Sequence, residues 1–341
     1  MKKLLKVSLA FSTLLVAMGC SNNNETIEEA EPFEEIGEEE VLPSYTYPLS
    51  GMEASELPDQ RVVGVTINNH PAARPQSGLA DADIIYEILS EFEVTRLVAL
   101  FHSQLPNRVG PVRSARPYHI DLVNGYNGLF VSHGWSPEAR RMLEGGGADH
   151  LNGLFHDGTL FQRSTERKAP HNSYITFDNI RKGLEDSGYD LSGSVPPLSF
   201  YESDDIYVTG DSGTKIDINY FDYNRVTYQL DEATGNYHRF NGDQQTVDYE
   251  TNEMIQVSNL LIIETEHEVL DDDGRRAINL TSGGKAILFQ SGIANVVNWE
   301  SQNGQIVAVD DNGEPVKLKA GQTWINVVPT SPGLEYMVTY E

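Results

Sequence analysis

The sequence has one cysteine, Cys20, among 341 residues, and fewer than half as many basic as acidic side chains. A single cysteine excludes disulfide bonds and paired-thiol chemistry from the folded part of the chain. Because 24 Lys and Arg face 51 Asp and Glu, the formal charge is −27, which disfavours a nucleic-acid partner. P-loop, GxGxxG, GxSxG, HExxH and paired CxxC motifs are missing as well, so no motif defines an enzyme class.

The N-terminus carries the features of an export signal. Lys2, Lys3 and Lys6 form the positively charged start of this region. The apolar run Leu4–Met18, which includes Lys6 near its start, is too short for a comfortable membrane span and ends at Gly19-Cys20. The lone cysteine after this run is similar to the lipidation site of bacterial lipoproteins, although Ala17 replaces the usual leucine. We expect residues 1–19 to be a signal peptide and Cys20 to be the lipidated (for example palmitoylated) N-terminus. Cleavage elsewhere, or an uncleaved anchor, is the alternative.

An acidic stretch follows the signal. Residues 21–60 contain twelve acidic residues and no Lys or Arg, and they contain few large apolar residues. Such a composition cannot bury enough apolar surface to fold, so we expect residues 20–59 to form a disordered tether. Its negative charge would hold the folded body away from an anionic membrane surface.

Charge and histidine content divide the rest of the chain. Residues 61–181 hold eleven arginines and one lysine against twelve acids, together with seven of the nine histidines. Residues 182–341 hold nine basic and 27 acidic residues. Binding or catalytic residues are therefore expected in the first of these segments.

Sequence periodicity predicts an α+β protein. Residues 61–67, 84–89, 94–101 and 129–132 are typical of strands, and helices are expected from Ser114, from Ser136-Pro137 to Gly145, and over 176–187. Beyond about 195, short strands alternate with turns. We predict an N-terminal α/β domain with a mixed sheet over 60–195, followed by a smaller β-rich domain over 196–341.

The stretch GPVRSARP, residues 110–117, places Arg113 and Arg116 at an expected helix start. A helix N-terminus already carries partial positive charge, so each arginine costs about 0.3–1 kcal/mol unless an anion answers it. A ligand phosphate or carboxylate would suit this position. Pairing with an internal carboxylate and simple solvation remain the alternatives; the candidate carboxylates are Asp83, Glu87 and Glu91.

Three histidines follow apolar strands: His70, His102 and His133. If those strands run parallel, the histidines meet at the sheet edge where open α/β sheets bind ligands, with Asn68, Asn69 and Arg74 on the same rim. The alternative is that histidines are simply frequent at strand ends. A metal site is not favoured, because His119 and Asp121 would point to different sides of a helix. Ser282–Lys285 matches SxxK but is more simply a hairpin turn.

Several stretches together resemble the YerB lipoproteins of Gram-positive bacteria, a family of unknown function. They are 68–79 (NNHPAARPQSGL), 82–87, 110–122, 169–172 and 321–325. The resemblance implies a membrane-anchored extracytoplasmic protein with an N-terminal α/β domain and a C-terminal β-rich domain. It implies no established activity, and we expect no cofactor.

We therefore expect an extracytoplasmic protein that binds an anionic cell-envelope ligand and is held to the membrane by its lipid alone. The residues expected at the site are Asn69, His70, Arg74, Glu87, Arg113, Arg116 and His133. Wall-peptide carboxylates, teichoic-acid phosphates or an acidic envelope protein would be the partner. The alternatives are a wall-polymer hydrolase with a histidine base and a scaffold without a small ligand. Whether the protein is an enzyme therefore stays open.

Overall fold

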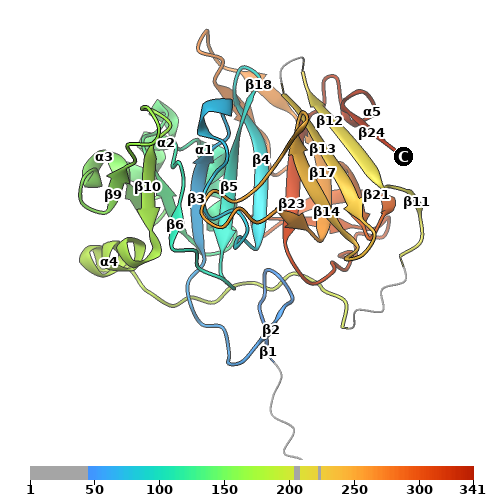
Figure 1. Ribbon diagram of the computed structural model, residues 1–341, viewed down its shortest axis with the longest axis horizontal. Coiled ribbons are helices and arrows are strands. Elements are labelled where there is room, and N and C mark those ends of the chain that lie inside the picture. Colours follow the sequence, from blue (N-terminus) through green and yellow to red (C-terminus); the bar gives the residue numbers. More distant parts are fainter. Residues whose placement is uncertain (1–44, 203–207, 222–223) are drawn as a thin grey trace, which may run out of the picture. The chain divides into compact units, whose positions relative to one another are not determined.

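The computed structural model describes residues 45–202, 208–221 and 224–341 (Figure 1). The predicted signal peptide, Cys20 and most of the predicted tether lie outside these ranges. The described residues belong to one compact unit, Ser44–Glu341. Within the described ranges, no helix combines the length and the apolar character that crossing a bilayer requires.

An eleven-stranded mixed sheet forms the centre of this unit. It takes strands from both sides of residue 195, and the parallel pair β4–β23 joins the two groups. The predicted domain boundary at 195 stays a prediction. The strand order is β11 (Asp211–Ser212), β21 (Ile293–Gln302), β20 (Gly284–Gln290), β17 (Asn259–Thr265), β23 (Thr323–Pro329), β4 (Ile84–Glu91), β5 (Val94–Phe101), β3 (Val63–Asn68), β7 (Leu129–Ser132) and β8 (His150–Asn152), with β22 (Gln305–Val309) on β21.

Smaller sheets surround the large one. A six-stranded sheet contains β15 (Gln244–Gln245), β14 (Asn236–Asn241), β13 (Asn224–Asp231), β12 (Lys215–Tyr220), β24 (Val338–Tyr340) and β16 (Gln256–Val257). A three-stranded sheet contains β6 (Arg108–Val109), β10 (Ser173–Thr176) and β9 (Phe161–Arg163). Two two-stranded sheets complete the set: β1 (Tyr45–Thr46) with β2 (Glu53–Ala54), and β18 (His267–Val269) with β19 (Arg276–Ile278).

The predicted α/β character is present only in part. Strands β3, β7 and β8 are parallel, and the helices α1 (Pro117–Asn124) and α2 (Pro137–Glu144) lie between them in the chain. Parallel neighbours need such crossovers. However, β4 and β5 form an antiparallel hairpin, and β3 pairs with β5 antiparallel. The mixed sheet is thus as expected, but hairpins dominate the architecture because most connections are too short to hold a helix.

Helices cover both faces of the parallel strands. Side chains of α1 and α2 join one buried apolar cluster, whereas α4 (Phe177–Ser187) joins the cluster on the other face. Gly64 of β3 lets α1 approach closely, because a β-carbon there would lie 2.2 Å from Cγ2 of Val123. The six-stranded sheet packs its apolar residues into the same cluster as α4, against β17 and β23 (Figure 1).

Most predicted helix limits are confirmed. Ser136 caps α2 by accepting from the N–H of Ala139, and Thr176 caps α4, which ends at the left-handed Gly188. The predicted cap at Ser114 is wrong. Helix α1 begins at Pro117, because proline favours the first helical position, and Arg116 takes the cap position without a side-chain cap. Three short turns are also helical: η1 (Pro71–Ala73), α3 (Gly153–His156) and α5 (Leu334–Met337).

Part of the predicted tether is folded. Residues 45–54 form β1 and β2, and Leu49 is completely buried. The backbone N–H groups of Leu198 and Gly321 donate to the carbonyls of Pro48 and Ser50. The acidic residues that predict disorder are concentrated in residues 25–40. The prediction used the composition of the whole stretch and therefore missed the ordered residues at its C-terminal end.

Candidate anion-binding site

The carboxyl ends of two parallel strands bring predicted site residues to one sheet edge. Strands β3 and β7 run parallel, so Asn68, Asn69 and His70 lie near His133. His102 follows the antiparallel strand β5 and therefore lies at the opposite edge, where its Nε2 contacts the carbonyl of Gln60. His102 therefore does not belong to the expected group, and His70 and His133 follow strands that end at the same edge.

Arg113 lies between these strand ends. Its N–H donates to the carbonyl of Thr66 in β3, and its carbonyl accepts from the N–H of His133. The guanidinium is half-buried, which lowers its pKa, and it makes no hydrogen bond or ion pair with any described residue. An arginine stays protonated at neutral pH in spite of such a shift. Arg113 is therefore a cation without a counter-charge among the described residues.

Two stacked histidines face the same region. The rings of His70 and His171 lie 4.6 Å apart between centroids and 22° from parallel. His171 Nδ1 accepts from Asn68 Nδ2 at 2.9 Å, and His70 Nδ1 accepts from the N–H of Ala72 at 3.1 Å. A neutral histidine whose Nδ1 accepts carries its proton on Nε2. Both rings therefore hold an Nε2–H donor that has no partner among the residues described.

The pKa of His171 reflects its burial first and its charged surroundings second. Burial, then the neighbouring His70 and then Arg113 lower the pKa of His171 below the ordinary histidine value. An anion placed beside Arg113 would reverse the last two of these effects, because opposite charge favours the protonated ring.

His133 is held in an orientation that does not suit a general base. Its Nε2 accepts from Nη2 of Arg163 at 2.8 Å, because a guanidinium can only donate. The proton of the neutral ring therefore lies on Nδ1, which donates to Oγ of Ser173 at 2.7 Å. A ring that donates to a serine hydroxyl cannot remove its proton. Burial and the charge of Arg163 lower the pKa of His133, so the ring is neutral near pH 7.

Arg116 forms an ion pair with an internal carboxylate. Its Nη2 pairs with Glu91 Oε1, and the same carboxylate accepts from Nη2 of Arg96 at 2.6 Å. Both arginines are buried. Internal pairing, one of the alternatives for these arginines, therefore holds for Arg116, whereas Arg113 has no partner among the residues that the structure describes.

Glu87 is also an internal group. It is fully buried, and its Oε2 pairs with Nη2 of Arg239 at 2.7 Å. Its Oε1 accepts from Asn69 and from Thr95, each at 3.0 Å. The ligand role expected for Glu87 is corrected, because every oxygen has a protein partner and none reaches the surface.

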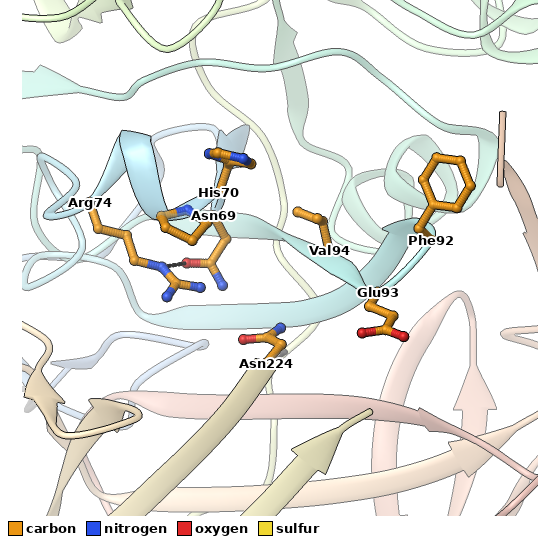
Figure 2. Close-up of a pocket in the computed structure, with 8 residues that line it drawn as sticks. Asn69, His70, Arg74, Phe92, Glu93, Val94 and Asn224 are labelled. Carbon is orange, nitrogen blue, oxygen red and sulfur yellow. Dashed lines mark hydrogen bonds between the residues drawn. The ribbon is translucent and has the colours of Figure 1, made fainter. Parts of the chain in front are cut away.

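Asn69 and Arg74 connect this buried network to a cavity of about 440 Å³. Asn69 is buried, and its Oδ1 accepts from Nε of Arg74 at 3.1 Å (Figure 2). Arg74, Asn69 and His70 line one side of the cavity, and residues 92–94 of the β4–β5 hairpin line another. His70 therefore belongs both to the stacked pair and to the cavity wall.

The described residues contain no group of three or more His, Cys, Asp or Glu side chains placed to hold a metal ion. Cationic and neutral donors predominate instead, and they suit a phosphate or carboxylate. His171 and Arg163 were not among the residues predicted for the site. The stretch Ala169–Asn172, one of those that resemble the YerB family, was the available signal for His171. The position of Arg163 depends on the pairing of β9 with β10, which no local motif reveals.

Family models match most of this chain. Residues 49–190 match the model described as "Protein of unknown function (DUF3048) N-terminal domain", and residues 216–325 match the corresponding C-terminal domain. The chain is 44% identical over 284 residues to "Putative lipoprotein YerB" of Bacillus subtilis, which covers 83% of this chain and 86% of that protein.

A solved structure agrees with this relationship. The crystal structure of the YerB protein from Bacillus subtilis has a TM-score of 0.81 and 42% sequence identity to this chain. The alignment covers 87% of this chain and 99% of that one. The chain therefore belongs to the YerB family of DUF3048 proteins, whose function is unknown.

Proposed function

We propose that this protein is a membrane-anchored extracytoplasmic lipoprotein that binds an anionic group of the cell envelope. The binding group is the cationic cluster, defined as Arg113, His70 and His171, with His133 and Arg74 beside it. The observation that carries the proposal is the Arg113 guanidinium, which is half-buried and has no counter-charge in the described structure.

The location rests on two separate features. A relative whose alignment covers 83% of the chain is named "Putative lipoprotein YerB". In addition, Cys20 follows a short apolar run that has lysines at its N-terminal end. The acidic stretch after Cys20 would keep the folded unit away from the membrane surface by charge repulsion.

The donors in the cluster suit an oxyanion. Arg113 offers a planar fork for two oxygens, and the Nε2–H groups of His70 and His171 add two neutral donors. Hydrogen bonds that involve a charged group contribute about 1.5–3 kcal/mol each. Removal of Arg113 should therefore weaken binding by about one to two orders of magnitude, since 1.4 kcal/mol is a factor of ten.

Pull-down on purified sacculi, prepared with and without wall teichoic acid, tests the proposal. We expect the full chain to bind, and Arg113→Ala to lose binding. Arg181→Ala, which changes an exposed arginine on α4, is the matched control. Circular dichroism verifies that each variant is folded. Binding that requires teichoic acid would identify phosphate as the anion, and binding without it would identify carboxylate.

Two outcomes of that experiment would contradict the proposal. Soluble wall fragments released over time would favour the hydrolase alternative. Absence of binding in the wild type, with no release, would favour the scaffold alternative and would make Arg113 a structural residue.

Binding should strengthen on mild acidification. The pKa values of His171 and His133 lie below the ordinary histidine value of about 6.5, so both rings are neutral near pH 7. Lowering the pH below about 6.5 therefore begins to add positive charge beside Arg113, while ligand carboxylates stay ionised above about pH 5. The sacculus affinity should rise as the pH falls from about 7.5 toward about 5, and His171→Gln should reduce the rise. An affinity that falls over this range would contradict the cluster as the binding group.

A further inference from the structure

The cavity beside the cationic cluster has ionisable side chains of opposite sign in its wall. Its volume of about 440 Å³ falls within the range of about 300–1,000 Å³ that is typical of small-molecule sites. Arg74 and Glu93 both line it, and Figure 2 shows them on either side of Asn224. Arg74 follows η1, whereas Glu93 lies at the tip of the β4–β5 hairpin, so the fold brings the two charges to one cavity.

The arginine of the cavity has free donors. Only Nε of Arg74 is used, in the hydrogen bond to Asn69, and Nη1 and Nη2 contact no described acceptor. Burial and then the neighbouring Arg239 lower the pKa of Arg74 to about 10, so it is still a cation at neutral pH. Asn69 fixes the direction of the guanidinium, and its outer nitrogens are available to a carboxylate.

The carboxylate of the cavity, Glu93, also lacks a hydrogen-bond or ion-pair partner among the described residues. Oε2 of Glu93 is enclosed and has no hydrogen-bond partner, and Glu93 forms no ion pair with any described residue. Burial lowers the pKa of Arg276, and the nearby charge of Glu93 partly offsets this effect. However, Nη2 of Arg276 donates to the carbonyl of Phe92 and not to Glu93. Glu93 lines the cavity, so an ammonium group of a bound ligand would supply the hydrogen-bonded counter-charge that its carboxylate lacks among the described residues.

The wall between the two charges is mainly apolar. Pro71, Phe92 and Val94 contribute to it, and Phe92 is 61% exposed at the hairpin tip. Asn224 adds an amide that donates weakly to Thr95 at 3.4 Å. A hydrophobic side chain between an amino group and a carboxylate would match this order of groups.

We infer that the cavity binds a short peptide that carries a free amino group, with its amine at Glu93 and a carboxylate at Arg74. This inference rests on the proposed function, because it names the class of the anionic ligand. A polymer whose only ionised groups are phosphates would leave Glu93 without a partner.

Calorimetric titration with the dipeptide alanyl-valine, its N-acetyl form and its C-amide form tests the inference. Wild type should prefer the zwitterion over each blocked form by about tenfold, the effect of one charge-assisted contact. Glu93→Gln should remove the preference for the free amine alone, and Arg74→Gln the preference for the free carboxylate alone. Glu268→Gln, on an exposed strand, should change neither.

The result also separates this inference from the proposed function. Equal binding of the three dipeptides, or no binding of any, would overturn the peptide inference even if sacculus binding still depends on Arg113. A preference for the free amine that disappears in Glu93→Gln would support the inference even if sacculi do not bind. If Glu93→Gln lowers the melting temperature and leaves the preference intact, Glu93 serves Arg276 and the inference fails.

Discussion

Arg239→Met is expected to lower the free energy of unfolding by about 3–5 kcal/mol, because it leaves the buried carboxylate of Glu87 without its cation. Both side chains are essentially inaccessible to solvent, and their charged atoms lie 2.7 Å apart between β14 and β4. The guanidinium also donates to Thr246 and lies 4.6 Å from the ring centroid of Trp324. The ion pair thus connects the six-stranded sheet to the eleven-stranded sheet.

Urea unfolding of single and double variants separates this pair from its surroundings. Glu87→Gln alone should also be strongly destabilising, whereas Glu87→Gln with Arg239→Met should cost less than the sum of the two. Arg225→Met, on the same sheet but exposed beside Asp217, should change stability by about 0.5 kcal/mol or less. A cost below about 1 kcal/mol for Arg239→Met would show that the pair does not hold the sheets together.

Asn69→Ala is expected to have the second largest effect, on the order of 3 kcal/mol. All hydrogen-bonding capacity of this buried amide is used. Oδ1 accepts from Arg74 and Gln76 at 3.1 and 2.9 Å, and Nδ2 donates to Glu87 and Thr95 at 3.0 and 2.8 Å. Truncation leaves buried donors and acceptors without partners, which costs more than a lost surface contact.

Asn69→Asp should be at least as damaging, because it places a second carboxylate beside Glu87 and removes a donor. Asn298→Ala changes an exposed asparagine on β21 and is the matched control. Thermal melting and urea unfolding measure the stability of all three variants. Wild-type stability in Asn69→Ala would mean that the network is solvated, and that Arg74 is not positioned by Asn69.

The sequence predicted the parts of the fold that depend on local signals. The limits of α2 and α4 follow from a cap, a proline or acid in the first turn, and a terminal glycine. Strand β3 follows from a run rich in β-branched residues, and β7 follows from a short apolar run. The sheet edge that joins Asn69, His70 and His133 was predicted as well, because it depends only on β3 and β7 being parallel.

The features that were not predicted depend on contacts between residues far apart in the sequence. His102 was misplaced because the direction of β5 depends on its hairpin with β4. The partner of Glu87 is Arg239, which lies 152 residues away in the chain, so no spacing rule distinguishes this carboxylate from a ligand-binding one. Arg113 and Arg116 look alike in the sequence, but only Arg116 lies against Glu91.

The central claim is that Arg113 provides the cation that binds an envelope anion. The most direct test is the affinity of the full chain for sacculi at about 150 mM salt, where surface charge effects are screened. We expect wild type to bind best and Arg113→Ala to bind at least tenfold more weakly. Arg113→Lys should be intermediate, because lysine keeps the charge but loses the planar fork. Equal affinity of wild type and Arg113→Ala would contradict it.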